Sequence, residues 1–261
     1  MHKYYKKRKE AIYEKIKLCR GGGRLLSSNR KGFTHAEGAT HVAMLNSQHR
    51  FGFTLAEVLV TLGIIGVVSA MTVPSLMQNY QKQSYITQLH KVYNELSQSL
   101  VRYQTDKNAV NLREAGLNNH DALSDFVKST FKVVKECETM QNCFADEYKT
   151  LAGTSAEAYY SREYNSYILA SGAALRPLYS SSGNKLINIA VDINGQKGPN
   201  ITGRDFFFVY VYNNGYIDDS DSDAPLSTEI REEMFSNGCQ KGTTLYGCFG
   251  KILNDNWQMT Y

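Results

Sequence analysis

The chain has 261 residues, of which 42% are hydrophobic and 21% charged, and its formal net charge is +4. Residues 1–52 contain 12 Lys and Arg against 3 Glu, a net of +9, so residues 53–261 carry 4 − 9 = −5. The basic character therefore belongs to the N-terminal segment, and the charge of the whole chain does not indicate a nucleic-acid-binding protein.

A long run without charge follows the basic segment. From Val58 to Gln81 there are 24 residues with no charged side chain, more than the roughly 20 apolar residues that a helix needs to cross a bilayer. We therefore predict a transmembrane and assembly helix over residues 53–77, continued by an amphipathic helix over residues 78–105. The basic residues before the run predict that residues 1–52 are cytoplasmic and that the C-terminal domain lies on the other side of the membrane.

One carboxylate, Glu57, lies at the start of the apolar run. An ionisable group within a membrane segment is costly and is read as functional by default. Phe53 and Glu57 are four residues apart, so they lie on one face of a helix. If the chain is cut after Gly52, the new ammonium group of Phe53 can pair with Glu57 of its own or a neighbouring subunit, because a pair of charges costs less in lipid than two separate ones.

The sequence Gly-Phe-Thr-Leu-Ala-Glu at residues 52–57, followed by the apolar run, resembles the processing site of type IV prepilins and of type II secretion pseudopilins. The resemblance implies cleavage between Gly52 and Phe53 by a prepilin peptidase, N-methylation of Phe53 and a role for Glu57 in assembly. Pro74 lies where this family commonly has a proline. The resemblance also implies an α+β, pilin-like fold, in which a long N-terminal helix, membrane-spanning in its first half, packs on a small antiparallel β-sheet domain.

Other interpretations of the N-terminal region stay open. The apolar run can be a plain membrane anchor, or a secretory signal peptide cut before Met71, although signal peptides are typically only 15–30 residues long. Residues 31–37 partly repeat residues 51–57, but a polar stretch follows this first copy. It cannot present a membrane helix to a membrane peptidase. A removed leader of residues 1–52 is long for the family, and a translation start at Met44 would shorten it without moving the cleavage site.

Two helices are predicted after the membrane segment. Apolar residues recur at spacings of three and four between residues 85 and 103, which indicates an amphipathic helix whose apolar face packs on the extracytoplasmic globular domain, residues 106–261. Asp121 is predicted to cap a second helix that carries Leu123, Phe126, Val127, Phe131 and Val134.

The globular domain is predicted to contain an antiparallel meander. Residues 150–185 are expected to be loop with one short strand, Tyr167–Leu169. The composition of Leu186–Asp192 and Phe206–Tyr212 indicates strands, and the turn residues between them indicate a structural connection. Asn213-Asn214-Gly215 predicts a tight turn. The segment from Cys248 to Tyr261 is expected to supply a last strand and an apolar plug.

Four cysteines lie in the exported part of the chain, and Cys19 lies in the leader. An even number of cysteines in an oxidising compartment indicates disulfides. The simplest pairing is Cys137 with Cys143 and Cys239 with Cys248, although four cysteines allow three connectivities. Four free thiols are the alternative, and neither spacing is typical of a zinc site.

An acidic cluster is the candidate metal site. Asp218, Asp219, Asp221 and Asp223 offer oxygen ligands at closely spaced positions, which suits calcium, and some pseudopilins bind calcium in their C-terminal region. The cluster does not match a helix–loop–helix calcium loop, and a solvated acidic loop is the alternative interpretation.

No nucleophile elbow, phosphate-binding loop or paired metal-binding histidine occurs, so we expect no enzymatic activity. The expected function is a prepilin-like structural subunit, anchored in the bacterial inner membrane and polymerised with other pilin or pseudopilin subunits in a type IV pilus or a type II secretion pseudopilus. The alternatives are a minor, tip-type subunit that binds cargo, a surface or DNA, and a plain membrane-anchored extracytoplasmic protein or enzyme.

Overall fold

The computed structural model describes residues 53–156 and 164–261. The predicted leader, including Cys19 and Gly52, lies outside the described residues. The elements of the described chain follow one another in this order: α2 (Leu55–Asp106), α3 (His120–Thr130), β1 (Val133–Cys137), β2 (Ser166–Leu169), β3 (Ala174–Ser182), β4 (Lys185–Asp192), β5 (Phe206–Tyr212), β6 (Ile217–Asp218), α4 (Thr228–Met234), the π-helix η2 (Phe235–Cys239) and α5 (Cys248–Asn254).

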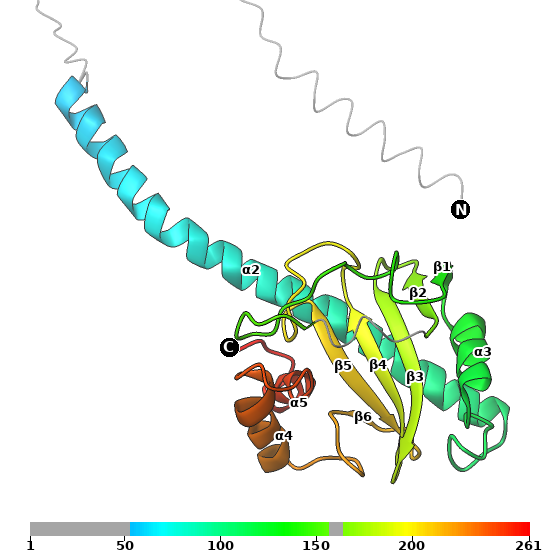
Figure 1. Ribbon diagram of the computed structural model, residues 1–261. Helices are drawn as coiled ribbons and strands as arrows, with labels where there is room; N and C mark the ends of the chain where they lie inside the picture. Colours follow the sequence, from blue (N-terminus) through cyan, green and yellow to red (C-terminus); the bar gives the residue numbers. More distant parts are fainter. Residues whose placement is uncertain (1–52, 157–163) are drawn as a thin grey trace, which may run out of the picture. The chain divides into compact units, whose positions relative to one another are not determined.

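Helix α2 is one continuous helix of 52 residues, and Pro74 lies inside it (Figure 1). Its first half has no buried side chain, and the first buried residue is Ile86. The second half buries one stripe at spacings of three and four, which confirms the predicted amphipathic helix. The buried residues of α2 are Ile86, Leu89, Val92, Leu96 and Leu100.

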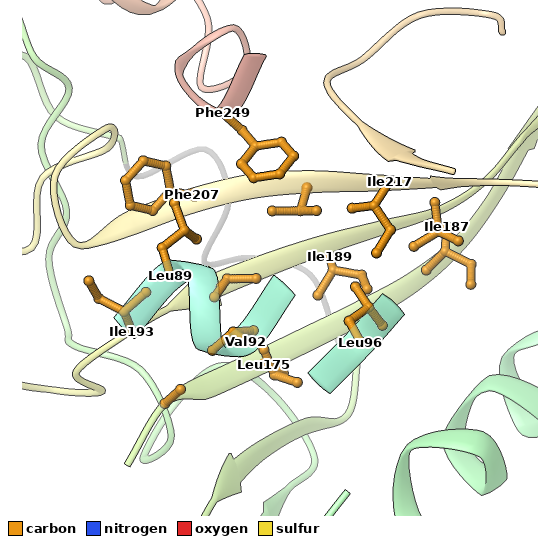
Figure 2. Packing of buried hydrophobic residues seen from close by; sticks show 14 of the residues in the cluster. Leu89, Val92, Leu96, Leu175, Ile187, Ile189, Ile193, Phe207, Ile217 and Phe249 are labelled. Atoms are coloured by element: carbon orange, nitrogen blue, oxygen red, sulfur yellow. The ribbon is translucent and has the colours of Figure 1, made fainter. Parts of the chain in front are cut away.

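The sheet has six strands in the order β1-β2-β3-β4-β5-β6, and every neighbouring pair is antiparallel. This confirms the meander and the α+β layout expected from the sequence. Side chains alternate between the two faces of each strand, so Ile189 and Val209, which pair across β4 and β5, point to the same face. That face packs against α2 (Figure 2).

The other face of the sheet is also covered. Phe206 and Phe208 on β5 point away from α2 and pack with Phe144 and Tyr148 from the segment between β1 and β2. Both faces of β5 are therefore dry, which explains why all seven of its residues are buried and why its sequence is apolar without alternation.

Three sequence-based expectations were wrong. Residues 150–185 contain the nine-residue strand β3. The sequence does not predict this strand, because Pro177 and the run of serines have low strand propensity. The second helix is capped by the Asn119 side chain, with Asp121 in the first turn, and it ends at Thr130, so that Phe131 and Val134 lie beyond it and Val134 belongs to β1. The C-terminal segment forms helix α5 instead of a strand, because Gly247 turns the chain at a φ of 96° and Phe249 and Ile252, one helical turn apart, both enter the core.

Both short-range cysteine pairs are joined in the structure. Cys137 is bonded to Cys143 with Cα atoms 6.2 Å apart, and Cys239 is bonded to Cys248 with Cα atoms 5.4 Å apart. These are the pairs that the sequence favoured. The second bond links the end of η2 to the start of α5, so it closes the C-terminal helical region.

We predict that Leu100→Ala destabilises the protein by about 2–5 kcal/mol, because Leu100 of α2 is fully buried in the hydrophobic core. The matched control is Val101→Ala, next to it on the helix but 61% exposed, which is expected to change stability by less than about 0.5 kcal/mol. Urea unfolding of the two variants in detergent checks the difference, and equal losses would contradict this packing.

We predict that replacing both Cys239 and Cys248 by Ser lowers the free energy of unfolding by about 2–3 kcal/mol, because the closed loop is short and its chain-entropy gain is modest. Unfolding of the oxidised parent and of the double variant, each followed by circular dichroism, measures the loss. An unchanged unfolding midpoint would show that the bond does not restrain the unfolded chain.

Candidate functional site: the N-terminal end of helix α2

The N-terminus of α2 is closed by a reciprocal capping box. Thr54 is the N-cap, and its Oγ1 accepts a hydrogen bond from the Glu57 backbone N–H at 3.2 Å. The Glu57 carboxylate returns the contact, because its Oε2 accepts from the Thr54 N–H at 2.8 Å and from the Thr54 hydroxyl at 3.0 Å. Each side chain thus satisfies a backbone donor that the helix end leaves free.

The capping role of Thr54 was missed in the sequence analysis. The signal was present, since a Thr followed three residues later by Glu, just before an apolar run, is the sequence signature of a capping box. Glu57 therefore has two properties that matter: its carboxylate caps its own helix in the single chain, and it is the charged side chain at the start of the apolar segment.

The first half of α2 is largely apolar, and every residue from Phe53 to Gln81 is exposed in the described chain. It passes the length and composition test for a membrane span, and none of its most apolar 18-residue window is buried. Phe53, at the very start, is 86% exposed. A soluble monomer does not expose an apolar surface of this kind, so lipid or other protein must cover it. The exposed large apolar side chains of this half are Phe53, Leu55, Val58, Leu59, Val60, Leu62, Ile64, Ile65, Val67, Val68, Met71, Val73, Leu76, Met77 and Tyr80.

The carboxylates of the acidic cluster, which the sequence suggested as a calcium site, are engaged by donors within the protein. Both carboxylate oxygens of Asp218 are bound by Arg231, at 2.8 and 2.6 Å, and Asp218 Oδ2 also accepts from the Leu226 N–H. Asp219 is fully buried and accepts from the N–H groups of Gly247 and Gly250. Burial raises the pKa of Asp219, and the backbone donors act against this rise.

The remaining two carboxylates of the cluster turn to local partners. Asp221 Oδ1 accepts from the Ser222 N–H, and Asp223 Oδ1 accepts from the Ala224 N–H and from the Asn184 side chain. Within residues 53–156 and 164–261, no group of three His, Cys, Asp or Glu side chains is placed to hold a metal ion. The four aspartates therefore organise the loop after β6 and join it to α4 and α5.

A second buried acidic pair lies in the connection between β4 and β5. Asp192 accepts a hydrogen bond from the Tyr148 hydroxyl, and Asp205 accepts from the N–H groups of Asn200 and Ile201. Burial raises the pKa of Asp192 to about 8, a rise that the Tyr148 hydrogen bond opposes and the nearby charge of Asp205 increases. Burial also raises the pKa of Asp205. The two carboxylates hold the connection in its observed path.

Comparison with known proteins identifies one segment. Residues 47–73 match the family model described as the prokaryotic N-terminal methylation motif. No curated protein and no solved structure matches the chain. The matched segment includes the predicted cleavage point, the capping box and most of the apolar half of α2.

We predict that stability falls as pH rises from about 5 to about 8. The folded-state pKa of Asp192 lies above its ordinary value of 3.8, so the folded chain holds this proton more tightly than the unfolded chain does. The resulting stabilisation is complete at low pH and is lost as pH rises toward 8, at up to about 1.4 kcal/mol per pH unit. Asp205 acts in the same direction.

Urea unfolding between pH 5 and pH 8 tests this prediction. The Asp192→Asn variant is expected to show a shallower pH dependence than the parent. The control is Asp125→Asn, which changes an exposed aspartate on α3 and should keep the slope of the parent. If parent and Asp192→Asn have the same slope, the carboxyl group is not protonated in the folded state.

Proposed function

The chain carries the prokaryotic N-terminal methylation motif, the hallmark of type IV pilins and pseudopilins, and we propose that it is a structural subunit of a type IV pilus or of a type II secretion pseudopilus. In this proposal a prepilin peptidase cuts between Gly52 and Phe53, and Phe53 is then N-methylated. The basic leader is cytoplasmic, and the sheet domain is extracytoplasmic. The chain itself is a substrate and a building block, with no catalytic role.

The observation that carries the proposal is the exposed apolar half of α2, placed directly after the methylation motif. The exposed apolar side chains of this half must be shielded from water, in the single chain and in a polymer. In the single chain, lipid covers it, since its length matches the hydrocarbon thickness of a bilayer. In a polymer, the same helices from many copies cover one another, and the sheet domains remain outside because they are already packed on both faces.

Glu57 is the residue for which the two states differ most. In the single chain its carboxylate is held by Thr54 of the same helix. After cleavage the ammonium group of Phe53 lies next to this cap, and in the polymer the carboxylate of one copy pairs with the ammonium group of another. Because an uncompensated charge in an apolar environment is costly, this pairing sets the stagger between neighbouring helices.

The first test is the intact mass and N-terminal residue of the chain recovered from membranes that contain a prepilin peptidase. We expect a chain that starts at methylated Phe53. A chain that starts at Met71 would be a secreted protein cut by signal peptidase, and an uncut chain would be a membrane anchor only. Either of these outcomes would overturn the proposal.

The second test separates the charge of Glu57 from its role in the helix cap. Glu57→Gln keeps a side chain that can complete the capping box but removes the charge, and Thr54→Val removes the cap at a cost of about 1 kcal/mol but keeps the charge. We expect Glu57→Gln to abolish polymer formation and Thr54→Val to retain it, as measured by the amount of polymer sheared from cells. All variants should remain in the membrane fraction. The reverse pattern would show that Glu57 acts only as a helix cap.

A further inference from the structure

The globular domain has one end that faces the apolar half of α2. In the core, Leu89 of α2 lies beside Ile193 and Phe207, whereas Leu96, two turns further on, lies nearer Ile187 and Ile217 (Figure 2). The sheet end formed by the β4–β5 connection, residues 193–205, is therefore the end at which α2 enters the domain, as the ribbon also shows (Figure 1). We call it the basal end.

Tyr85 supports this placement independently. It is the residue before Ile86, the first buried position of α2. Burial raises the pKa of the Tyr85 hydroxyl, and the charges of Asp205 and Arg204 act on it in opposite directions. The charge of Arg204 therefore lies near Tyr85, and Tyr85 is about one helical turn from Lys82 along α2.

Basic side chains gather at the basal end. Lys149 is held beside the connection because its N–H donates to Asn200 O at 2.9 Å and its carbonyl accepts from Thr202 N–H at 2.8 Å. Lys241 precedes Gly242, where an added Cβ would collide with Thr150 Oγ1, so this turn is packed on the segment after Lys149. The basal patch is defined as Lys82, Lys149, Lys197, Arg204 and Lys241.

The basal patch is positive in a negative domain. Asp146 and Glu147 are exposed in the same region, whereas Asp192 and Asp205 are buried and hydrogen-bonded. Five basic against two exposed acidic side chains leave a net of +3, although residues 53–261 as a whole carry −5. In the described part of the chain, no ion pair or hydrogen bond engages the charged groups of Lys149, Lys197 or Arg204, and all three residues are exposed.

The spacing along α2 brings this patch to the membrane surface. Lys82 is five residues beyond Met77, the end of the predicted span, which is about 7–8 Å along the helix axis. The polar headgroup layer extends about 5–7 Å beyond the hydrocarbon on each side. An average helix tilt of about 20° lowers one side of the domain further. Lys82 thus lies near the level of the lipid phosphates, and the basal end of the domain begins about one helical turn beyond it, at Tyr85 and Ile86.

We propose that the basal patch binds the phosphate groups of anionic phospholipids and holds the domain against the bilayer while the subunit is a membrane-anchored monomer. The inference rests on the proposed function, since it requires α2 to span the membrane. Lipid phosphate is the partner that both the charge and the position fit, because juxtamembrane Lys and Arg are attracted to an anionic surface. The acidic remainder of a second copy would attract the patch as well, but in the single chain the exposed apolar half of α2 places the patch next to lipid. Extraction into a polymer must then break these contacts.

The test uses the full chain, processed and purified, at one copy per lipid nanodisc. Nanodiscs of phosphatidylcholine alone are compared with nanodiscs that contain 30% phosphatidylglycerol, a fraction chosen as a working value of about one lipid in three to give an anionic surface. Amine labelling followed by mass spectrometry reports the rate at each lysine. We expect labelling of Lys149, Lys197 and Lys241 to fall about fivefold in anionic discs. Lys107, which is exposed at the far end of α2, is the internal control.

Two further conditions make the outcome decisive. Raising the salt to about 1 M shortens the screening length to about 3 Å and should restore labelling. In a variant with Lys149→Gln and Arg204→Gln, Lys197 and Lys241 should be labelled equally in both lipids. Equal labelling of the parent in both lipids would overturn the inference and leave the proposed function intact. Protection that appears only with two or more copies per disc would overturn it in favour of contact between copies. A chain that does not enter nanodiscs at all would contradict the proposed function itself.

Discussion

The structure depends on a single helix that meets two different environments. Helix α2 is apolar on every side up to Tyr80, and from Ile86 onward it is apolar along only one stripe. The stripe lies against the near face of the sheet and supplies the core. Helix α2 runs without interruption from Leu55 to Asp106, with Pro74 inside it. The domain is therefore joined to the exposed half by one continuous helix, and the functional proposals made for this chain follow from that continuity.

The remainder of the domain covers both faces of the sheet, so that in the described chain most of the exposed apolar surface lies on the first half of α2. The segment between β1 and β2 covers the far face with Phe144 and Tyr148. On the near face, Phe249 of α5 and Trp257 of the segment after it lie next to Tyr93 of α2. The sheet is thereby shielded on both sides. A domain built in this way gains little from burying its surface against a second copy, so assembly is left to the helix and to charges at the surface.

The carboxylates of the acidic cluster, which suggest a metal site in the sequence, stabilise contacts between segments of the folded chain. Asp219 joins the loop after β6 to the start of α5 through Gly247 and Gly250, and Asp218 joins the same loop to α4 through Arg231. On burial each carboxylate loses its hydrogen bonds to water. The backbone N–H groups or the guanidinium group that donate to it offset the free-energy cost of that loss. The same logic holds for Asp192 and Asp205, which brace the basal connection.

What the sequence determined by itself was everything carried by local or periodic signals. The methylation motif, the span from Val58 to Gln81, the buried stripe of α2 and strands β4 and β5 follow from residue types at short spacing, and their physical causes act within a few turns of helix or a few residues of strand. The pairing of cysteines six and nine residues apart belongs to the same class.

Tertiary structure alone decided the rest. Strand β3 forms despite Pro177 because β2 and β4 pair with it, and α5 is a helix because its apolar residues fill the core beside α2. The aspartates of the acidic cluster became internal acceptors because Arg231 and Gly250, 13 and 31 residues away along the chain, reach them, and no local pattern specifies contacts at such separations.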